Sequence, residues 1–294
     1  GADGGSNAGD VPWVTDDTGK AVGVAVGAAE AGDGWMNFKL WRAGVTNVVS
    51  LRLPLRGLAY SATAPFNCPK SAVILSNAVN VLASRPLNYG SPGSEIVALA
   101  MLASGNPNLL PTLQTFARSR TVPQPGDWFW GPSYCGVFLA EYYLKTGDTN
   151  VLPTLAGIAL YCANGQDRYG TMCHGPGFNN ADGSPNGTAG GYGPVNAVGV
   201  TANLAMVMAK KCLVAAGWPV DPAISAAITR GANYFGWYAQ KGELQYGEHL
   251  PWGPGFHAAN GKHAGAAMLF AMLGNRPVET EYWARMTLAG YLGR

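Results

Sequence analysis

The stretch from Trp130 to Gly147 reads WGPSYCGVFLAEYYLKTG, and it contains the signals that predict the fold. A Pro stands near its start, an apolar helical pattern follows, and a Gly marks its end, which is the asymmetry typical of α-helices. The opening aromatic-Gly-Pro phrase recurs along the chain, once with an inserted Ser: Tyr89-Gly90-Ser91-Pro92, Trp130-Gly131-Pro132, Tyr192-Gly193-Pro194 and Trp252-Gly253-Pro254. This recurrence predicts a repeated helical unit.

Each phrase opens a pair of helical patterns. The first helices of the pairs are expected over 95–104, 133–146, 195–216 and 257–273, each followed by Gly. The second helices are expected over 109–118, 151–163, 222–241 and 278–292, and a further helix over 71–84 precedes the first pair. Hairpins of this size cannot bury their apolar faces alone, so we expect a mainly α fold in which they stack as an α/α toroid or an open arc.

The first sixty residues follow a different pattern. Residues 16–31 have helical spacing, whereas residues 36–42 and 48–53 alternate with period two and predict two strands around a turn at 43–47. The phrase FKLWRAG at 38–44 resembles the closing hairpin of a PDZ domain, although no peptide-binding function is carried over. We therefore divide the chain into a Gly-rich arm at 1–10, a partial PDZ-like α+β unit at 11–60 and a helical-hairpin domain at 61–294.

Composition excludes several classes of partner. Charged residues make up 12% of the 294 residues, where about 25% is usual. The formal net charge is +2 without a basic block, so we expect no nucleic-acid partner. No window of about 18 uninterrupted apolar residues occurs, so we expect no membrane span. The motifs CxxC, CxxCH and HExxH are missing from the sequence, so we expect neither a metal nor a cofactor.

The N-terminus and the cysteines bear on localisation. The start GADGGSNAGD is typical of a processed end, and with the low charge it predicts an exported protein, extracellular or at the cell surface. Cys162 and Cys173 bracket a short polar loop as a disulfide would, whereas Cys135 and Cys212 lie in apolar helical patterns typical of buried thiols. The five cysteines cannot all pair internally.

Four further phrases resemble an uncharacterised family of exported bacterial proteins. They are SATAPFNCPKS at 61–71, FLAEYYLKTGD at 138–148, GGYGPVNA at 190–197 and ARMT at 284–287. Members of that family combine a PDZ-like segment with an α/α toroid, and the resemblance covers about residues 16–294. The resemblance implies this architecture for the chain, but no activity can be transferred from the family. Because the family pattern continues with further helices, the resemblance leaves two alternatives: a ring that closes on another subunit, or a trimmed relative adapted to assembly.

The long connections over 119–130, 164–194 and 242–256 are expected on one face, where most of the unusual chemistry gathers. The candidate catalytic residues of a glycan-acting enzyme are Asp127, Asp167, Asp182, Glu248 and His249. The candidate binding residues are Trp128, Trp130, Tyr169, His174, Tyr192, Trp252 and His257. Glycoside hydrolysis needs two carboxylates, and aromatic rings stack on sugars. In the alternative interpretation the aromatic-Gly-Pro phrases only cover the hairpins, and the carboxylates cap helices or bind loop amides.

Two functions follow from these patterns. Low charge, abundant Gly and aromatic residues and an odd cysteine predict an exported, non-catalytic protein that self-associates into an extracellular filament or ring. The contacts of this homo-oligomer are expected through the N-terminal arm and exposed helix faces. The alternative is a glycan-acting hydrolase or lyase that uses the long-connection face.

Overall fold

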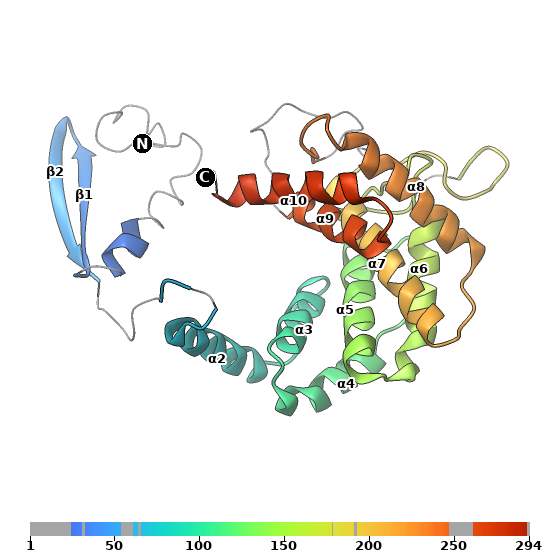
Figure 1. Ribbon diagram of the computed structural model, residues 1–294, viewed down its shortest axis with the longest axis horizontal. Helices are drawn as coiled ribbons and strands as arrows, with labels where there is room; N and C mark the ends of the chain where they lie inside the picture. The colour runs from blue at the N-terminus through green and yellow to red at the C-terminus, as the bar shows by residue number, and fades with distance from the viewer. Residues whose placement is uncertain are drawn as a thin grey trace. The chain divides into compact units, whose positions relative to one another are not determined.

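The computed structural model describes residues 25–30, 33–53, 61–63, 66–177, 179–190, 193–246 and 261–292 (Figure 1). The chain divides into two compact units. Unit 1 is formed by residues 1–81 with Arg294, and unit 2 by residues 82–293. The protein is mainly helical with a β-hairpin near the N-terminus, as the sequence predicts.

Unit 1 contains the hairpin of β1 (Trp35–Arg42) and β2 (Val45–Arg52), which pair antiparallel. Arg42 pairs with Val45, so Ala43 and Gly44 alone form the turn. Their φ angles of 51° and 80° are those of a type I′ turn, whose twist matches that of the strands. The predicted turn over 43–47 is therefore wrong in length, because this tight turn lets β2 begin at Val45.

Apolar side chains of the hairpin are exposed on both of its faces. Met36 is buried, whereas every residue of β2 is exposed. Trp41 is 71% exposed and Val48 is 64% exposed, and both lie on one face of the hairpin by the pairing register. The helix α2 (Pro69–Ala83) begins in the same unit, where Lys70 lies 3.7 Å from the carboxylate of Glu30. Unit 1 thus leaves a large apolar area on its surface.

The described part of unit 2 is built of four helical hairpins in sequence (Figure 1). They are α3 (Gly93–Ala103) with α4 (Leu110–Arg118), α5 (Trp130–Thr146) with α6 (Leu152–Gly165), α7 (Asn196–Ala215) with α8 (Pro222–Tyr238), and α9 (Lys262–Leu273) with α10 (Pro277–Leu292). The predicted helical segments are confirmed as helices, whereas a repeat architecture built from these pairs stays a prediction. Within the described residues, the helix predicted over 257–273 begins at Lys262, because Gly261 adopts φ 76° as its N-cap, and the predicted start at 257 lies outside the described residues.

The short connections within the hairpins repeat one set of local signals. Each first helix is followed by a Gly in the left-handed conformation, which any other residue would adopt only with strain: Gly105, Gly147, Gly217 and Gly274. A side-chain N-cap comes next in three of the four connections, from Asn106, Asp148 and Asp221. Every second helix has a Pro in its first turn, at Pro111, Pro153, Pro222 and Pro277. These signals explain why the helix ends were predictable.

The first helices of the hairpins pack on one another in chain order. α3 contacts α5, α5 contacts α7 and α7 contacts α9, while α6 contacts α8 in a second row. The approach of α5 to α7 is close, because a Cβ added at Gly136 would lie 2.9 Å from the Cβ of Ala205. Small residues thus bring α5 and α7 close together at this point. Closure of the two rows into a toroid stays a prediction.

The central helix, α7, is the longest of the described helices. Among the residues that the structure describes, it is the one helix that is long and apolar enough to cross a membrane, and 72% of its apolar window is buried within the protein. Its neighbours are α5, α6, α8 and α9. α7 therefore serves here as the core helix of unit 2.

All five cysteines are free and buried. The predicted burial of Cys135 and Cys212 is confirmed. The predicted disulfide between Cys162 and Cys173 is wrong, because Cys162 faces the core from α6, whereas the Cys173 thiol donates to the Gly175 carbonyl oxygen. Burial raises the pKa of the Cys162 thiol to about 12.

A charged cluster ties α4 to the connection between α5 and α6. The Arg118 guanidinium donates from Nε to Oδ2 of Asp148 at 2.8 Å, and the Tyr142 hydroxyl donates to the same oxygen at 3.1 Å. Asp148 also accepts from the Asn150 N–H as the cap of its helical turn. The hydrogen bond from Arg118 holds the pKa of Asp148 far below its usual value.

We expect Asp148 to make the free energy of unfolding pH-dependent. Its stabilisation is present above the unfolded-state pKa of about 4 and is lost as the pH falls toward the lower folded-state pKa. Asp148→Asn keeps a good cap but loses the charge, so its free energy of unfolding should fall less between pH 5 and pH 2. Asp148→Ala should be less stable than the Asn variant by about 1 kcal/mol at pH 7. Urea denaturation measures both effects, and equal pH slopes in wild type and Asp148→Asn would contradict the first.

Candidate functional site

The long connections meet at one end of unit 2. The Phe129 N–H, at the start of α5, donates to the His174 carbonyl oxygen at 2.7 Å. The Asn196 N–H, at the start of α7, donates to the Tyr246 carbonyl oxygen at 2.8 Å. Segments from all three long connections therefore lie at the N-terminal ends of α5 and α7.

An aromatic cluster forms where the first two of these connections touch. The Trp130 indole N–H donates to Nδ1 of His174 at 2.7 Å. The Trp128 ring stacks on the same imidazole, with ring centroids 5.0 Å apart and an angle of 26° between the planes. Since Nδ1 accepts, the imidazole is the tautomer with its hydrogen on Nε2. Three residues predicted as binding residues are thus brought together, and Trp128 stays 64% exposed.

A cleft of about 440 Å³ opens beside this cluster. Its lining joins the start of α5 to the start of α3 and consists of Ser91, Pro92, Asp127, Trp128, Trp130, Gly131 and Pro132. A second hollow of about 220 Å³ shares Ser91, Asp127, Gly131 and Pro132 with it and reaches inward to Glu95, Arg120 and Cys135. We call the two together the Trp128 cleft.

Glu95 is the acidic residue at the bottom of this cleft, and sequence reasoning missed it. Its carboxylate accepts from the Ser91 hydroxyl at 3.3 Å and lies 3.4 Å from the Arg120 guanidinium, which covers the Phe116 ring. Its side chain is 4% exposed. In the sequence, Glu95 is notable only as the one acidic residue of the otherwise apolar α3. Its place in the cleft depends on Arg120, which is 25 residues away in the sequence.

Asp127, a candidate catalytic residue from the sequence, is among the residues that line the cleft, and it also shapes the loop. Its carboxylate accepts from the Gln124 N–H at 2.8 Å, and its carbonyl oxygen accepts from the Tyr161 hydroxyl at 2.5 Å. Its side chain stays exposed. The buried thiol of Cys135 has its pKa raised to about 12 by desolvation, so it is a poor nucleophile at neutral pH.

Asp167 and Asp182 bind loop amides instead of lining the Trp128 cleft. One oxygen of the buried Asp167 accepts from the N–H groups of Tyr169, Gly170 and Thr171 at 2.9, 2.8 and 3.0 Å. The exposed Asp182 accepts from the hydroxyl and N–H of Ser184, whose hydrogen bonds lower the pKa of Asp182. Such contacts agree with the alternative interpretation from the sequence, in which these carboxylates bind loop amides. Their catalytic role stays a prediction.

The remaining predicted residues lie elsewhere. Tyr169 is half exposed, is not among the residues lining the cleft, and its hydroxyl accepts from Arg168 at 2.8 Å. Five predicted residues fall outside the described residues: Tyr192, Glu248, His249, Trp252 and His257. Within the described ranges, no three His, Cys, Asp or Glu side chains group closely enough to hold a metal ion.

A buried network of amides fixes the connection that carries His174. The Asn203 amide on α7 donates to the carbonyl oxygens of Gly170 and Gly199 at 3.1 and 2.8 Å. The Gln166 amide donates to the Asn203 side chain at 3.1 Å and to the Gly170 carbonyl oxygen at 3.0 Å, and it accepts from Arg230 at 2.9 Å. The sequence offered no local signal for this network, since its members are 37 and 64 residues apart.

Residues 71–294 match the model of a family described as Domain of unknown function (DUF6288). The chain belongs to this family. No curated protein and no solved structure matches the chain. The DUF6288 match begins within α2, so it includes α3 to α10 and the Trp128 cleft and leaves the β1–β2 hairpin outside.

The buried network yields a test of how the DUF6288 domain holds its long connection. Gly231 on α8 is packed directly on the Asn203 amide, so a Cβ there would overlap that side chain. We expect Gly231→Ala to displace Asn203 and to lower the free energy of unfolding by about 2 kcal/mol. The measurement is urea denaturation at pH 7.

Gly236→Ala is the matched control on the same helix. Its added Cβ would lie 3.4 Å from Nη2 of Arg276 and 3.5 Å from Oε1 of Glu279, which are ends of flexible side chains. Ala favours the helix over Gly by up to about 1 kcal/mol, so this variant should be as stable as wild type or more so. If both substitutions changed the free energy of unfolding equally, the position of the Asn203 side chain would not depend on the absence of a Cβ at Gly231.

Proposed function

We propose that this DUF6288 protein binds a glycan in the Trp128 cleft. The observation that carries the proposal is the exposed Trp128 ring, which is held by its stacking on His174 while His174 is held by the Trp130 indole N–H. An aromatic ring fixed in this way presents an apolar face to a sugar ring and loses little conformational freedom on binding.

Polar groups behind the ring supply the second part of sugar recognition. Ser91, Asp127 and Glu95 line the cleft and offer hydroxyl and carboxylate oxygens to sugar hydroxyl groups. The cationic residue in the lining, Arg120, is paired with Glu95, so the cleft carries no excess positive charge for a polyanion. This combination of one aromatic wall and several oxygen acceptors favours a neutral glycan.

Hydrolysis of the bound glycan would use the two carboxylates of this cleft. Glu95 and Asp127 both line it, whereas Asp167 and Asp182 bind loop amides. A glycosidase needs one carboxyl group to protonate the leaving oxygen and a second to act as base or nucleophile. The catalytic form of the proposal therefore rests on Glu95 with Asp127.

We expect Trp128→Ala to weaken glycan binding at least tenfold, because the exposed ring is the main apolar contact of the cleft. The measurement is affinity electrophoresis in gels containing a panel of neutral polysaccharides. Trp218→Ala is the control, since Trp218 is 39% exposed in unit 2 and is not among the residues that line the cleft.

The same panel separates binding from catalysis. If wild type releases reducing ends from a polysaccharide, and Glu95→Gln still binds the polysaccharide but releases none, the protein is a hydrolase. Binding without release by wild type would leave a carbohydrate-binding protein. Wild-type protein retarded by no polysaccharide in the panel, or retarded equally in Trp128→Ala, would contradict the proposal.

Self-association is the second candidate function, and the exposed hairpin of unit 1 supports it. β1 and β2 carry apolar side chains on both faces, and contiguous exposed apolar surface marks interaction sites. We propose that the protein is exported, that its copies pair through the hairpin, and that the row of α3, α5, α7 and α9 is one arc of an α/α toroid that another copy completes. The arm at 1–10, also predicted to make contacts, lies outside the described residues.

We expect substitutions on the hairpin to reduce the native mass of the assembly. One pair, Trp41→Ser with Val48→Ser, removes apolar area from one face, and Leu40→Ser with Leu51→Ser removes it from the other. At least one pair should yield the 30.6 kDa monomer in size-exclusion chromatography with light scattering. Leu144→Ser, at an exposed position of α5, is the control. A wild-type protein that is already monomeric would contradict self-association.

A further inference from the structure

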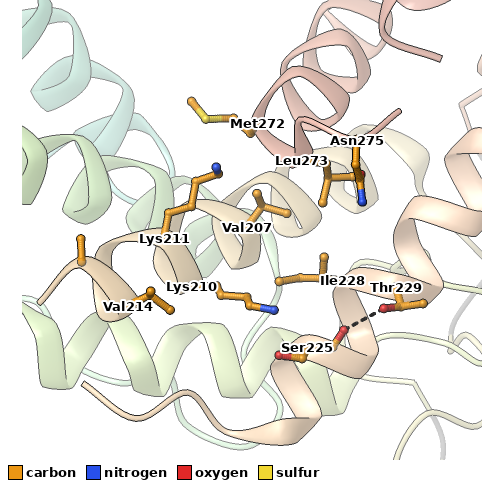
Figure 2. A pocket seen from close by; sticks show the side chains of 11 residues that line it. Val207, Lys210, Lys211, Val214, Ser225, Ile228, Thr229, Met272, Leu273 and Asn275 are labelled. Carbon is orange, nitrogen blue, oxygen red and sulfur yellow. Dashed lines mark hydrogen bonds between the residues drawn. The ribbon is translucent and has the colours of Figure 1, made fainter. Parts of the chain in front are cut away.

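A groove lies beside the C-terminal part of α7 (Figure 2). It has a volume of about 540 Å³ and runs between the C-terminal parts of α7 and α9 and the N-terminal half of α8. A further hollow of about 320 Å³ continues it, since Ile228, Thr229, Leu273 and Asn275 line both. This size is within the usual range for small-molecule sites.

Aliphatic side chains form part of the groove's walls, beside the polar residues Ser225, Thr229 and Asn275. Val207, Ile228 and Leu273 line it from three different helices, and Val214 extends the apolar surface to an exposed rim. Its lining includes no aromatic ring. A sugar would therefore find no ring to stack on, whereas a hydrocarbon chain would find apolar contacts along its length.

Two lysines add positive charge to this aliphatic lining. Lys210 and Lys211 leave α7 in different directions, Lys210 toward Ser225 and Ile228 and Lys211 on the side of Met272 (Figure 2). No hydrogen bond or ion pair joins the side chain of either lysine to another residue in the described part of the chain. No Asp or Glu lines either hollow. Arg276 also lines the second hollow but pairs with Glu279 at 3.3 Å. Lys210 and Lys211 are therefore the cations of the lining that no carboxylate among the described residues neutralises.

We propose that this groove binds a single-chain amphiphile with an anionic headgroup. The hydrocarbon chain lies along Val207, Ile228 and Leu273, and the headgroup pairs with the ammonium group of Lys210, while Lys211 adds positive charge from the side of Met272. A carboxylate and a phosphate head share this chemistry, because lysine binds either as a point charge. The apolar walls distinguish such a ligand from a free anion, and the two lysines distinguish it from a neutral hydrocarbon.

Isothermal titration calorimetry of the full chain with decanoate, below the concentration at which it forms micelles, tests the proposal. Decanoate should bind, 1-decanol and inorganic phosphate should bind at least tenfold more weakly, and each methylene removed from the chain should weaken binding by up to about fourfold. Decyl phosphate in place of decanoate distinguishes the two headgroups. Equal binding of 1-decanol, or binding of phosphate alone as tightly as decanoate, would overturn the proposal.

Charge variants locate the binding in the groove. The double variant Lys210→Gln with Lys211→Gln should lose at least tenfold in decanoate affinity. The control, Lys145→Gln with Lys241→Gln, changes the net charge equally at two lysines outside the groove and should bind as wild type does. Thermal unfolding without ligand verifies that both variants are folded. Equal affinities of the two double variants, or no binding of decanoate by wild type, would show that the groove is not this site.

Discussion

The side-chain amide of Asn203 donates from the middle of α7 to the main chain of the long connection at Gly170. Much of the site depends on this contact. Gln166 and Arg230 extend it to α6 and α8, and Gly231 leaves the space in which the amide is buried. The connection held in this way leads within four residues to His174, on which the Trp128 ring rests. A buried polar group without partners is costly, so this network admits few alternative loop positions.

The helical hairpins carry different residue types at their two ends, because short connections join the helices at one end and long connections join successive hairpins at the other. Short connections allow little variation, because a left-handed Gly, a polar cap and a Pro must follow one another within a few residues. Long connections are free of that requirement and carry the tryptophans and most of the acidic residues considered for function. The Trp128 cleft is therefore lined in part by long connections, whereas the groove beside Lys210 is lined mainly by the helices α7, α8 and α9.

Local signals in the sequence predicted the helices well, since a Pro, a cap or a Gly acts on its immediate neighbours. The aromatic cluster was predictable as a group, because Trp128, Trp130 and His174 all lie in long connections expected on one face. The role of Glu95 was not predictable, because its meaning depends on Arg120 and Asp127, which the fold brings to it from a distance. The same holds for Asn203, whose partners Gly170 and Gln166 lie 33 and 37 residues away. The length of the β-turn was misjudged because Ala43 adopts a positive φ that its side chain does not favour.

The buried free cysteines allow the local unfolding of single helices to be followed by chemical modification. Cys135, Cys162 and Cys212 lie on three helices of unit 2, and burial raises the pKa of each thiol. An alkylating reagent attacks the thiolate, so it reacts at an appreciable rate only after the local structure separates and exposes the sulfur. Because the three sites belong to α5, α6 and α7, their separate rates of modification would show whether these helices part together or one after another.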